Sequence, residues 1–185
     1  MIVFIVLVTL LILYIVYENH TRNKELLKYA QTDALTGLYN KETTEQLTDE
    51  LLSEDENKYH AFLILDVDCF KQINDIYGHA VGDIVLQKFG KLLKGTFREG
   101  DILGRIGGDE FGVIMKNIQT KDIAMKKAEE LLAKTQAYKI DELKGNNISI
   151  SIGISTAPQD GDCYMDLYKR ADQALYQAKR SGKAR

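Results

Sequence analysis

The chain has 185 residues, which suits one domain with a short attachment and is too short for two full domains. Its net charge of −3 provides no overall basic field, so we expect no nucleic-acid partner. Two cysteines, Cys69 and Cys163, are too few for a disulfide framework and are typical of a protein from a reducing compartment.

The first 17 residues form an uncharged apolar segment. Sixteen of them are hydrophobic, Thr9 being the exception, and Glu18 ends the run. As a helix the segment would span about 25 Å, slightly less than the ~30 Å hydrocarbon core of a bilayer. It has neither the positive leader nor the small-residue cleavage site of a signal peptide, and a core helix is rarely apolar on every face. We therefore predict one transmembrane anchor over residues 1–17.

The residues that follow orient the chain in this prediction. His20, Arg22, Lys24 and Lys28 come directly after the apolar run, and an excess of basic residues marks the cytoplasmic side of a membrane. Residues 18–31 contain no glycine or proline and carry a weak apolar stripe, which predicts a linker helix. The remaining residues, 32–185, are expected to form a cytoplasmic domain.

This domain alternates between helical and strand patterns. In chain order, the patterns predict a helix over 41–56, a strand over 61–65, a helix after Gly78, strands over 102–106 and 111–115, a helix over 121–136, a strand over 148–155 and a helix over 164–178. Gly107–Glu110 separates the two middle strands and indicates a hairpin. Tyr164, Tyr168 and Tyr176 recur at helical spacing and are predicted to lie in the core. The pattern as a whole predicts an α/β (α+β) fold with a central mixed β-sheet flanked by helices.

Carboxylates follow two of these strands. Asp66 and Asp68 come directly after the first strand, and Asp109 and Glu110 lie on the hairpin turn. Oxygen ligands from Asp66 and Asp109 are suited to Mg²⁺, which commonly bridges carboxylates and substrate phosphates. Gly107 and the glycine after it would let a triphosphate come close to the backbone. The pattern predicts cation-assisted chemistry on phosphates.

The same residues resemble a known family. Residues 107–111 spell GGDEF, 33–40 spell DALTGLYN, 66–75 spell DVDCFKQIND, 78–83 spell GHAVGD and 171–179 spell ADQALYQAK. These segments, in this order and spacing, resemble the signatures of the GGDEF-domain family of diguanylate cyclases, and the resemblance runs from Thr32 to the C-terminus. It implies a palm-like sheet of the nucleotidyl-cyclase type and the condensation of two GTP into cyclic di-GMP and two pyrophosphates.

The resemblance also implies roles for individual residues. Two Mg²⁺ (or Mn²⁺) ions per site would be held by Asp66, the main-chain carbonyl of Val67, and Asp109. The catalytic residues would be Asp109, as acceptor of the 3′-hydroxyl proton, together with Glu110 and Lys71. Substrate binding would involve Asn74 and Asp83 at the guanine base, Phe70 and His79 in the same pocket, and Lys71, Lys179 and Lys183 at the phosphates. Lys183 stands where the family usually has Arg, so it keeps the charge but loses the bidentate geometry.

A second ligand site is implied before the GGDEF segment. Arg98 and Asp101 resemble the R-x-x-D site at which the product cyclic di-GMP inhibits members of the family. The reaction itself predicts a homodimer, because each GTP must be attacked by the 3′-hydroxyl of a second one. The expected protein is therefore a single-pass diguanylate cyclase of the bacterial inner membrane, with its catalytic domain in the cytoplasm.

Three other functions remain open at this point. A catalytically silent GGDEF domain could bind cyclic di-GMP as a receptor, although such domains usually lose the GGDEF signature or the metal-binding Asp. A scaffold could pair through its linker helix without binding nucleotide, and a cyclase of altered base specificity could make a mixed adenine–guanine product. Asn74 and Asp83 favour a GTP-specific enzyme over the last two.

Overall fold

The structure is a computed structural model that describes residues 12–18, 22, 30–54, 58–180 and 182. Its elements are α2 (Lys41–Glu54), β1 (His60–Val67), α3 (Phe70–Tyr77), α4 (His79–Thr96), β2 (Ile102–Arg105), β3 (Glu110–Met115), α5 (Lys121–Ala137), a 3₁₀ turn (Asp141–Leu143), β4 (Ile150–Ala157) and α6 (Tyr164–Arg180). Every element predicted between 41 and 178 is present to within a few residues. Helix α3 was not predicted.

The predicted anchor and linker fall mainly on residues outside the described ones. Residues 12–18 are helical and exposed, whereas residues 1–11 and most of 19–29 lie outside the described part of the chain. Among the described helices, none combines the length and the apolar character that crossing a bilayer requires. The anchor over 1–17 and the linker helix over 18–31 therefore stay predictions.

The four strands form one sheet in the order β2-β3-β1-β4, and every neighbouring pair is antiparallel. The prediction of a mixed sheet was wrong. The connection through α3 and α4 does place β2 in the same direction as β1, but the hairpin then inserts β3 between them. Strand β4 pairs with the other side of β1, also antiparallel. The parallel strands of the sheet therefore never become neighbours.

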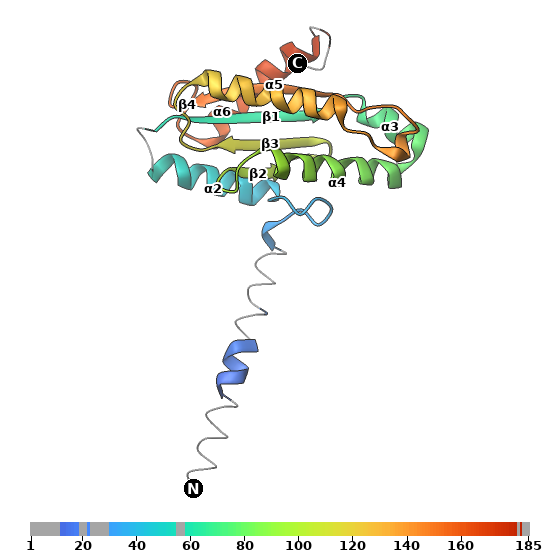
Figure 1. The fold of residues 1–185 in the computed structure, drawn as a ribbon. Coiled ribbons are helices and arrows are strands. Elements are labelled where there is room, and N and C mark those ends of the chain that lie inside the picture. Colours follow the sequence, from blue (N-terminus) through green and yellow to red (C-terminus); the bar gives the residue numbers. More distant parts are fainter. Residues whose placement is uncertain (1–11, 19–21, 23–29, 55–57, 181, 183–185) are drawn as a thin grey trace.

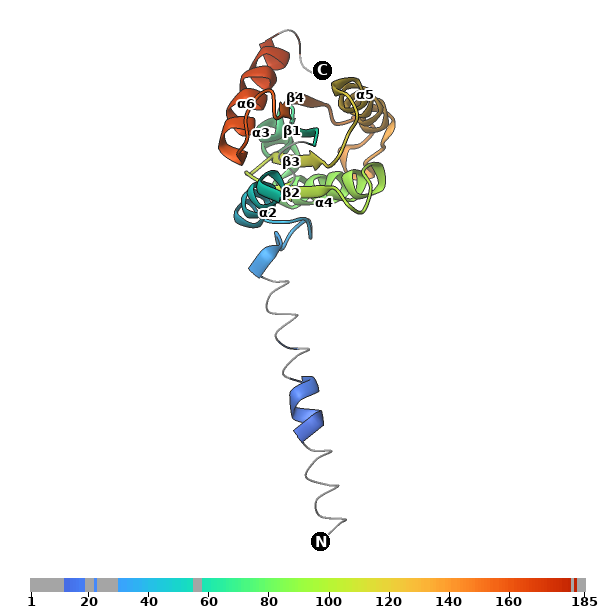
Figure 2. The ribbon, with the colours of Figure 1, turned by 90° about the vertical axis from the view of Figure 1, so that its left-hand side faces the viewer.

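Helices cover both faces of the sheet. Figure 2 shows α4 and α5 against one face and α2 and α6 against the other, with the sheet of Figure 1 seen between the two layers. Strand β1 is buried along its whole length, and its side chains alternate between the two layers. Leu63 and Leu65 belong to the core beneath α4 and α5, whereas Phe62 and Ile64 belong to the core beneath α2 and α6. By this alternation Asp66 lies on the α6 side.

Helix α6 lies unusually close to strand β4. A Cβ atom at Gly153 would lie 2.0 Å from the carbonyl oxygen of Ala171 and 2.6 Å from the amide nitrogen of Leu175. Only glycine permits this approach of helix backbone to strand backbone. The contact fixes the distance of α6 from the sheet and, with it, the position of the side chains in the last turns of α6.

Candidate active site

Acidic residues converge at the ends of β1 and β3. Asp66 is the penultimate residue of β1 and lies directly opposite Glu110, the first residue of β3, in the antiparallel register. The amide of Val67 donates a hydrogen bond to the carbonyl oxygen of Asp109 at 3.2 Å. The structure thus brings together all four of the residues that the sequence assigned to metal binding and proton transfer at this edge.

Lys179 enters this cluster from α6. Its Nζ lies 2.7 Å from Oδ2 of Asp66, whose side chain is 11% exposed. Burial raises the pKa of Asp66, with the nearby Asp109 and Asp68 adding to the shift, and the ion pair with Lys179 opposes it. Burial likewise raises the pKa of Glu110, helped by the charges of Asp66 and Asp109. The site is therefore short of positive charge and favours a bound cation or a retained proton.

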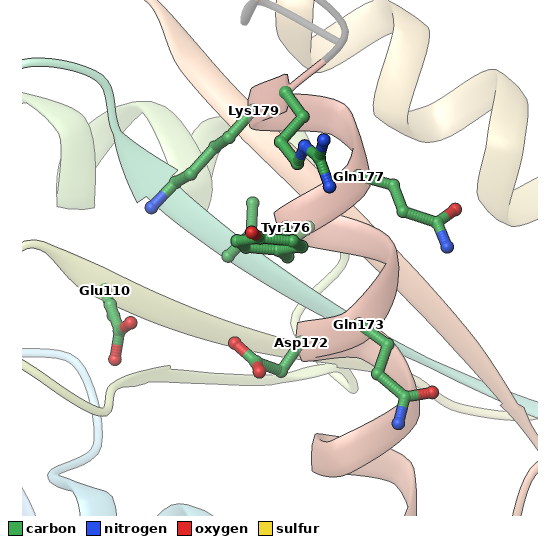
Figure 3. Close-up of a pocket in the computed structure, with 8 residues that line it drawn as sticks. Glu110, Asp172, Gln173, Tyr176, Gln177 and Lys179 are labelled. Carbon is green, nitrogen blue, oxygen red and sulfur yellow. The ribbon is translucent and has the colours of Figure 1, made fainter.

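A hollow of about 730 Å³ opens beside these residues, within the range of ordinary ligand pockets. It is lined by Glu110, Asp172, Gln173, Leu175, Tyr176, Gln177, Lys179 and Arg180. In Figure 3 the side chains of Asp172, Tyr176 and Lys179 project from α6 on the side that faces Glu110. Tyr164 is buried as predicted, but Tyr176 is 61% exposed, so its prediction as a core residue was wrong.

Arg105 holds the turn between β2 and β3 (residues 106–109), a role that the sequence did not reveal. Its Nε and Nη2 donate to the carbonyl oxygen of Gly108 at 3.2 and 2.7 Å, and its Nη1 donates to the carboxylate of Asp33 at 3.1 Å. Burial opposes ionisation of Asp33, yet hydrogen bonds from Thr36 and the charge of Arg105 hold its pKa below the usual value. Arg105 thus ties the residue before Asp109 to the segment that opens the domain.

Asp68 belongs to the structural framework of the site. Its two carboxylate oxygens accept hydrogen bonds from the hydroxyls of Ser149 at 2.9 Å and Ser151 at 2.8 Å, and its side chain is buried. Its amide also donates to the carbonyl oxygen of Ser149. These bonds join the end of β1 to β4, just before Cys69 takes a left-handed conformation and α3 begins. The sequence had placed Asp68 beside Asp66 without separating their roles.

The residues assigned to guanine gather where α3 meets α4. Phe70 and Asn74 pack from α3 against Gly82 of α4, where an added Cβ atom would lie 1.9 Å from Oδ1 of Asn74. That Oδ1 atom is buried and has no hydrogen-bond partner in the described structure. His79 and Asp83 are exposed on the first turns of α4. A buried acceptor without a partner, in a junction whose second helix also carries an exposed carboxylate, is suited to a base edge.

Lys71 and Lys183 are the two other lysines assigned to the phosphates, and only Lys71 lies in the described part of the chain. Lys71 is exposed on the first turn of α3, which directly follows the carboxylate-bearing end of β1. Lys183 lies outside the described residues, so its assignment stays a prediction.

Arg98 and Asp101 lie at a separate place before β2. Asp101 is buried, and its carboxylate accepts hydrogen bonds from Nε of Arg98 at 3.0 Å and from the amide of Lys116 at 3.1 Å. The Arg98 guanidinium also donates to the carbonyl oxygen of Lys116, while 59% of its side chain is exposed. A hollow of about 490 Å³ adjoins the pair and is also lined by Lys127. In this arrangement Asp101 supports Arg98, and Arg98 is the group available to a ligand.

The donor set at the strand ends fits a divalent cation. Carboxylate oxygens of Asp66 and Asp109 and the main-chain carbonyl of Val67 are the hard ligands that Mg²⁺ prefers. The ammonium group of Lys179 already lies against one of these oxygens, as a cation would. In the described part of the chain, the only group of three potential metal-ligating side chains within 4.8 Å of one another is Asp162, Cys163 and Asp166, so the carboxylates at the strand ends do not form a closed cage.

Comparison with known proteins identifies the family. The family model "Diguanylate cyclase, GGDEF domain" matches residues 30–185. Diguanylate cyclase A of Treponema denticola is 37% identical over 169 residues, covering 88% of this chain and 45% of that protein. The response regulator PleD of Caulobacter vibrioides is 37% identical over 174 residues, covering 90% of this chain and 38% of that protein.

A solved structure agrees with these matches. The coiled coil and GGDEF domain of DgcB from Caulobacter crescentus, crystallised in complex with c-di-GMP, aligns with a TM-score of 0.83 at 25% identity and covers 92% of this chain and 91% of that one. The present chain spans less than half the length of the two curated relatives. It shares their GGDEF domain over residues 30–185. The chain belongs to the GGDEF-domain family of diguanylate cyclases.

Proposed function

We propose that this chain is a diguanylate cyclase that condenses two GTP into cyclic di-GMP and two pyrophosphates. The observation that carries the proposal is the meeting of Asp66, Asp109 and Glu110 at two adjacent strand ends, with Lys179 against Asp66. The named activity of the relatives supports it. A silent cyclic di-GMP receptor is not favoured, because the carboxylates that the chemistry needs are all retained.

The chemistry uses these residues in distinct roles. The 3′-hydroxyl oxygen of one GTP attacks the α-phosphorus of another, a new O–P bond forms, the bond to the β-phosphate oxygen breaks and pyrophosphate leaves. Asp109, with Glu110 beside it, accepts the hydroxyl proton. Burial raises the pKa of Glu110, which makes its carboxylate a better proton acceptor than a fully exposed one. Lys71 and Lys179 bind the phosphate oxygens. The step occurs twice for each cyclic product.

Asp66, Asp109 and the carbonyl of Val67 would hold two divalent cations, Mg²⁺ or Mn²⁺. When bound, such ions lower the pKa of the attacking hydroxyl and neutralise charge on the departing pyrophosphate. Arg105 keeps the carboxylate of Asp109 in register with Asp66 by holding the preceding carbonyl group of Gly108. The protein thus contributes a preorganised acidic edge with its own counter-charge.

Base selection belongs to the junction of α3 and α4. Asn74 and Asp83 bind the guanine edge, with Asp83 accepting from the ring N–H and the exocyclic amine. Phe70 and His79 border the same site. Adenine offers no matching pair of donors at this edge, so the carboxylate of Asp83 favours GTP over ATP.

The complete cyclase works as a homodimer, because one site holds one GTP and the reaction joins two. Residues 1–17 anchor it in the bacterial inner membrane with residues 32–185 in the cytoplasm, as hydropathy and the basic residues after the anchor predict.

Product cyclic di-GMP binds at Arg98 and slows the enzyme. The exposed guanidinium of Arg98 and the hollow beside it support this proposal. Asp101 orients Arg98 there, and Lys127 is the second basic group of the hollow.

The proposal is tested by removing the metal-binding charges one at a time. Asp66→Asn and Asp109→Asn are each expected to reduce formation of cyclic di-GMP by at least about a thousandfold, because each removes a ligand of a catalytic ion. Glu99→Gln removes an exposed charge at the Arg98 turn and serves as the control for net charge. Near-normal turnover in both Asn variants would overturn the two-metal assignment.

A further inference from the structure

We propose that Lys179 occupies the cation position at Asp66 until GTP arrives, so that the nucleotide must bind before, or together with, the divalent ion at that oxygen. This inference rests on the proposed function and adds an order of binding to it. In this view Lys179 is both a phosphate ligand and the group that keeps the carboxylate edge neutral in the empty enzyme.

The Lys179 ammonium lies against a carboxylate oxygen that a metal ion would use. Nζ of Lys179 lies 2.7 Å from Oδ2 of Asp66, and the two side chains are only 35% and 11% exposed. Partial burial makes this attraction stronger than that of an ion pair on an open surface. In Figure 3 the Lys179 side chain extends away from α6 toward the end of β1. The ammonium therefore lies at the ligand oxygen that the first cation would use.

A rigid helix brings Lys179 to Asp66. Lys179 is in the last turn of α6, and the approach of α6 to the sheet is fixed at Gly153, where no side chain separates strand from helix. Leu175, one turn before Lys179, is buried against the same core. The lysine thus reaches Asp66 without any movement of the backbone, and only its side chain needs to rotate to release the carboxylate.

The carboxylates of the site need a balancing positive charge. Asp66 lies opposite Glu110 in the strand register and Asp109 lies beside them, so like charges gather at this edge. Lys179 offsets part of that charge. A divalent ion at about 2.1 Å from the same oxygen would be repelled by the ammonium, so one cation must displace the other. The triphosphate of GTP supplies several negative charges, which draw Lys179 away and attract the metal at once.

The consequence is reciprocal coupling between metal and nucleotide. If GTP frees Asp66 for the cation, then the cation must raise the affinity for GTP by the same factor. An enzyme of this design stays without its catalytic ion while no substrate is present. The effect is a property of the described site alone and needs no partner domain.

The coupling is tested by titrating the full chain with Mn²⁺ and following free Mn²⁺ by electron paramagnetic resonance. Titrations are run with and without 3′-deoxy-GTP, which lacks the attacking hydroxyl and cannot react, and the Mn²⁺ that this nucleotide binds in protein-free samples is subtracted. For the unaltered chain we expect 3′-deoxy-GTP to tighten Mn²⁺ binding at least tenfold. For Lys179→Met we expect Mn²⁺ alone to bind at least tenfold more tightly than to the unaltered chain, and the benefit from the nucleotide to shrink.

Arg180→Met is the matched control. Arg180 neighbours Lys179 on α6 and lines the same hollow, but its guanidinium lies over the ring of Tyr176 at 5.7 Å. The Arg180→Met variant loses the same charge as Lys179→Met, yet its Mn²⁺ affinity should be nearly unchanged. Lys179→Arg keeps the positive charge, so its Mn²⁺ binding without nucleotide should stay weak. Equal Mn²⁺ affinity in Lys179→Met and Arg180→Met would overturn the inference. Because the titration needs no turnover, absence of cyclase activity would count against the proposed function alone.

Discussion

At the scale of single residues, the site depends on carboxylates that the fold holds in unfavourable surroundings. Asp66 and Glu110 face each other across β1 and β3, partly buried and close to Asp109. Such an arrangement costs stability in the empty protein, because burial and like charges both oppose ionisation. Such a loss of stability is expected for a site whose carboxylates are arranged to bind cations.

Glu110→Gln should therefore stabilise the fold at alkaline pH. In the folded chain the pKa of Glu110 lies above its usual value of 4.5, so its ionisation above that pKa costs folding free energy, and this cost disappears below about 4.5. We expect the melting temperature of Glu110→Gln to exceed that of the unaltered chain at pH 8 and the difference to close as the pH falls to 4. Glu99→Gln is the control in the same melts. A gap that is absent at pH 8, or that widens toward pH 4, would contradict the assignment.

Sequence patterns predicted part of this site. The meeting of Asp66 and Asp109 was predictable, since both follow apolar strands and a hairpin joins the second strand to its neighbour. The pairing of Lys179 with Asp66 was not predictable, because it depends on where the last turn of α6 lies relative to the end of β1. The role of Arg105 was also hidden, since one of its partners is a main-chain carbonyl and the other, Asp33, is distant in sequence.

At the scale of elements, the contact between α6 and β4 positions the site. The helix backbone lies against Gly153, and two turns later the same helix places Lys179 at the carboxylate edge. Hydrophobic periodicity predicted both elements but not their separation, which depends on one glycine. Hydrophobic periodicity also missed α3, none of whose eight residues is buried and which follows a left-handed residue, Cys69. The prediction of a mixed sheet was wrong because the alternation of helices and strands along the chain does not specify which strands become neighbours.

Gly153→Ala tests the importance of this contact. The new methyl group would collide with the backbone of α6, so α6 must shift, and we expect a loss of about 3 kcal/mol or more in unfolding free energy, at or beyond the upper end of ordinary overpacking. Gly95→Ala is the matched control, because Gly95 is in α4 and a methyl group added there would meet no atom within 4 Å. That change should be neutral or stabilising by up to about 1 kcal/mol. Urea titrations giving the two variants equal stability would contradict this account of the packing.

At the scale of the whole molecule, one described domain presents one carboxylate edge and one guanine-facing junction, whereas the reaction needs two substrates. Pairing of two chains about an approximate two-fold axis would bring two such edges together. A membrane anchor and linker helix would raise the local concentration of partners, because both confine the domains near one another.

Specific activity should consequently rise with protein concentration until pairing is complete. We expect a dilution series in detergent to show this rise, and fusion to a dimeric coiled coil to flatten it. Light scattering on the same samples relates activity to the fraction of dimer. A constant specific activity for a chain that stays monomeric throughout the series would rule out the required pairing.

The most direct test of the central claim is to incubate the full chain with GTP and Mg²⁺ and identify the products by mass spectrometry and a pyrophosphate assay. We expect cyclic di-GMP and pyrophosphate in a ratio of one to two, no cyclic product from ATP alone, and no product with Asp109→Asn. Binding of cyclic di-GMP by a folded, dimeric chain that never converts GTP would contradict the account and identify a receptor instead.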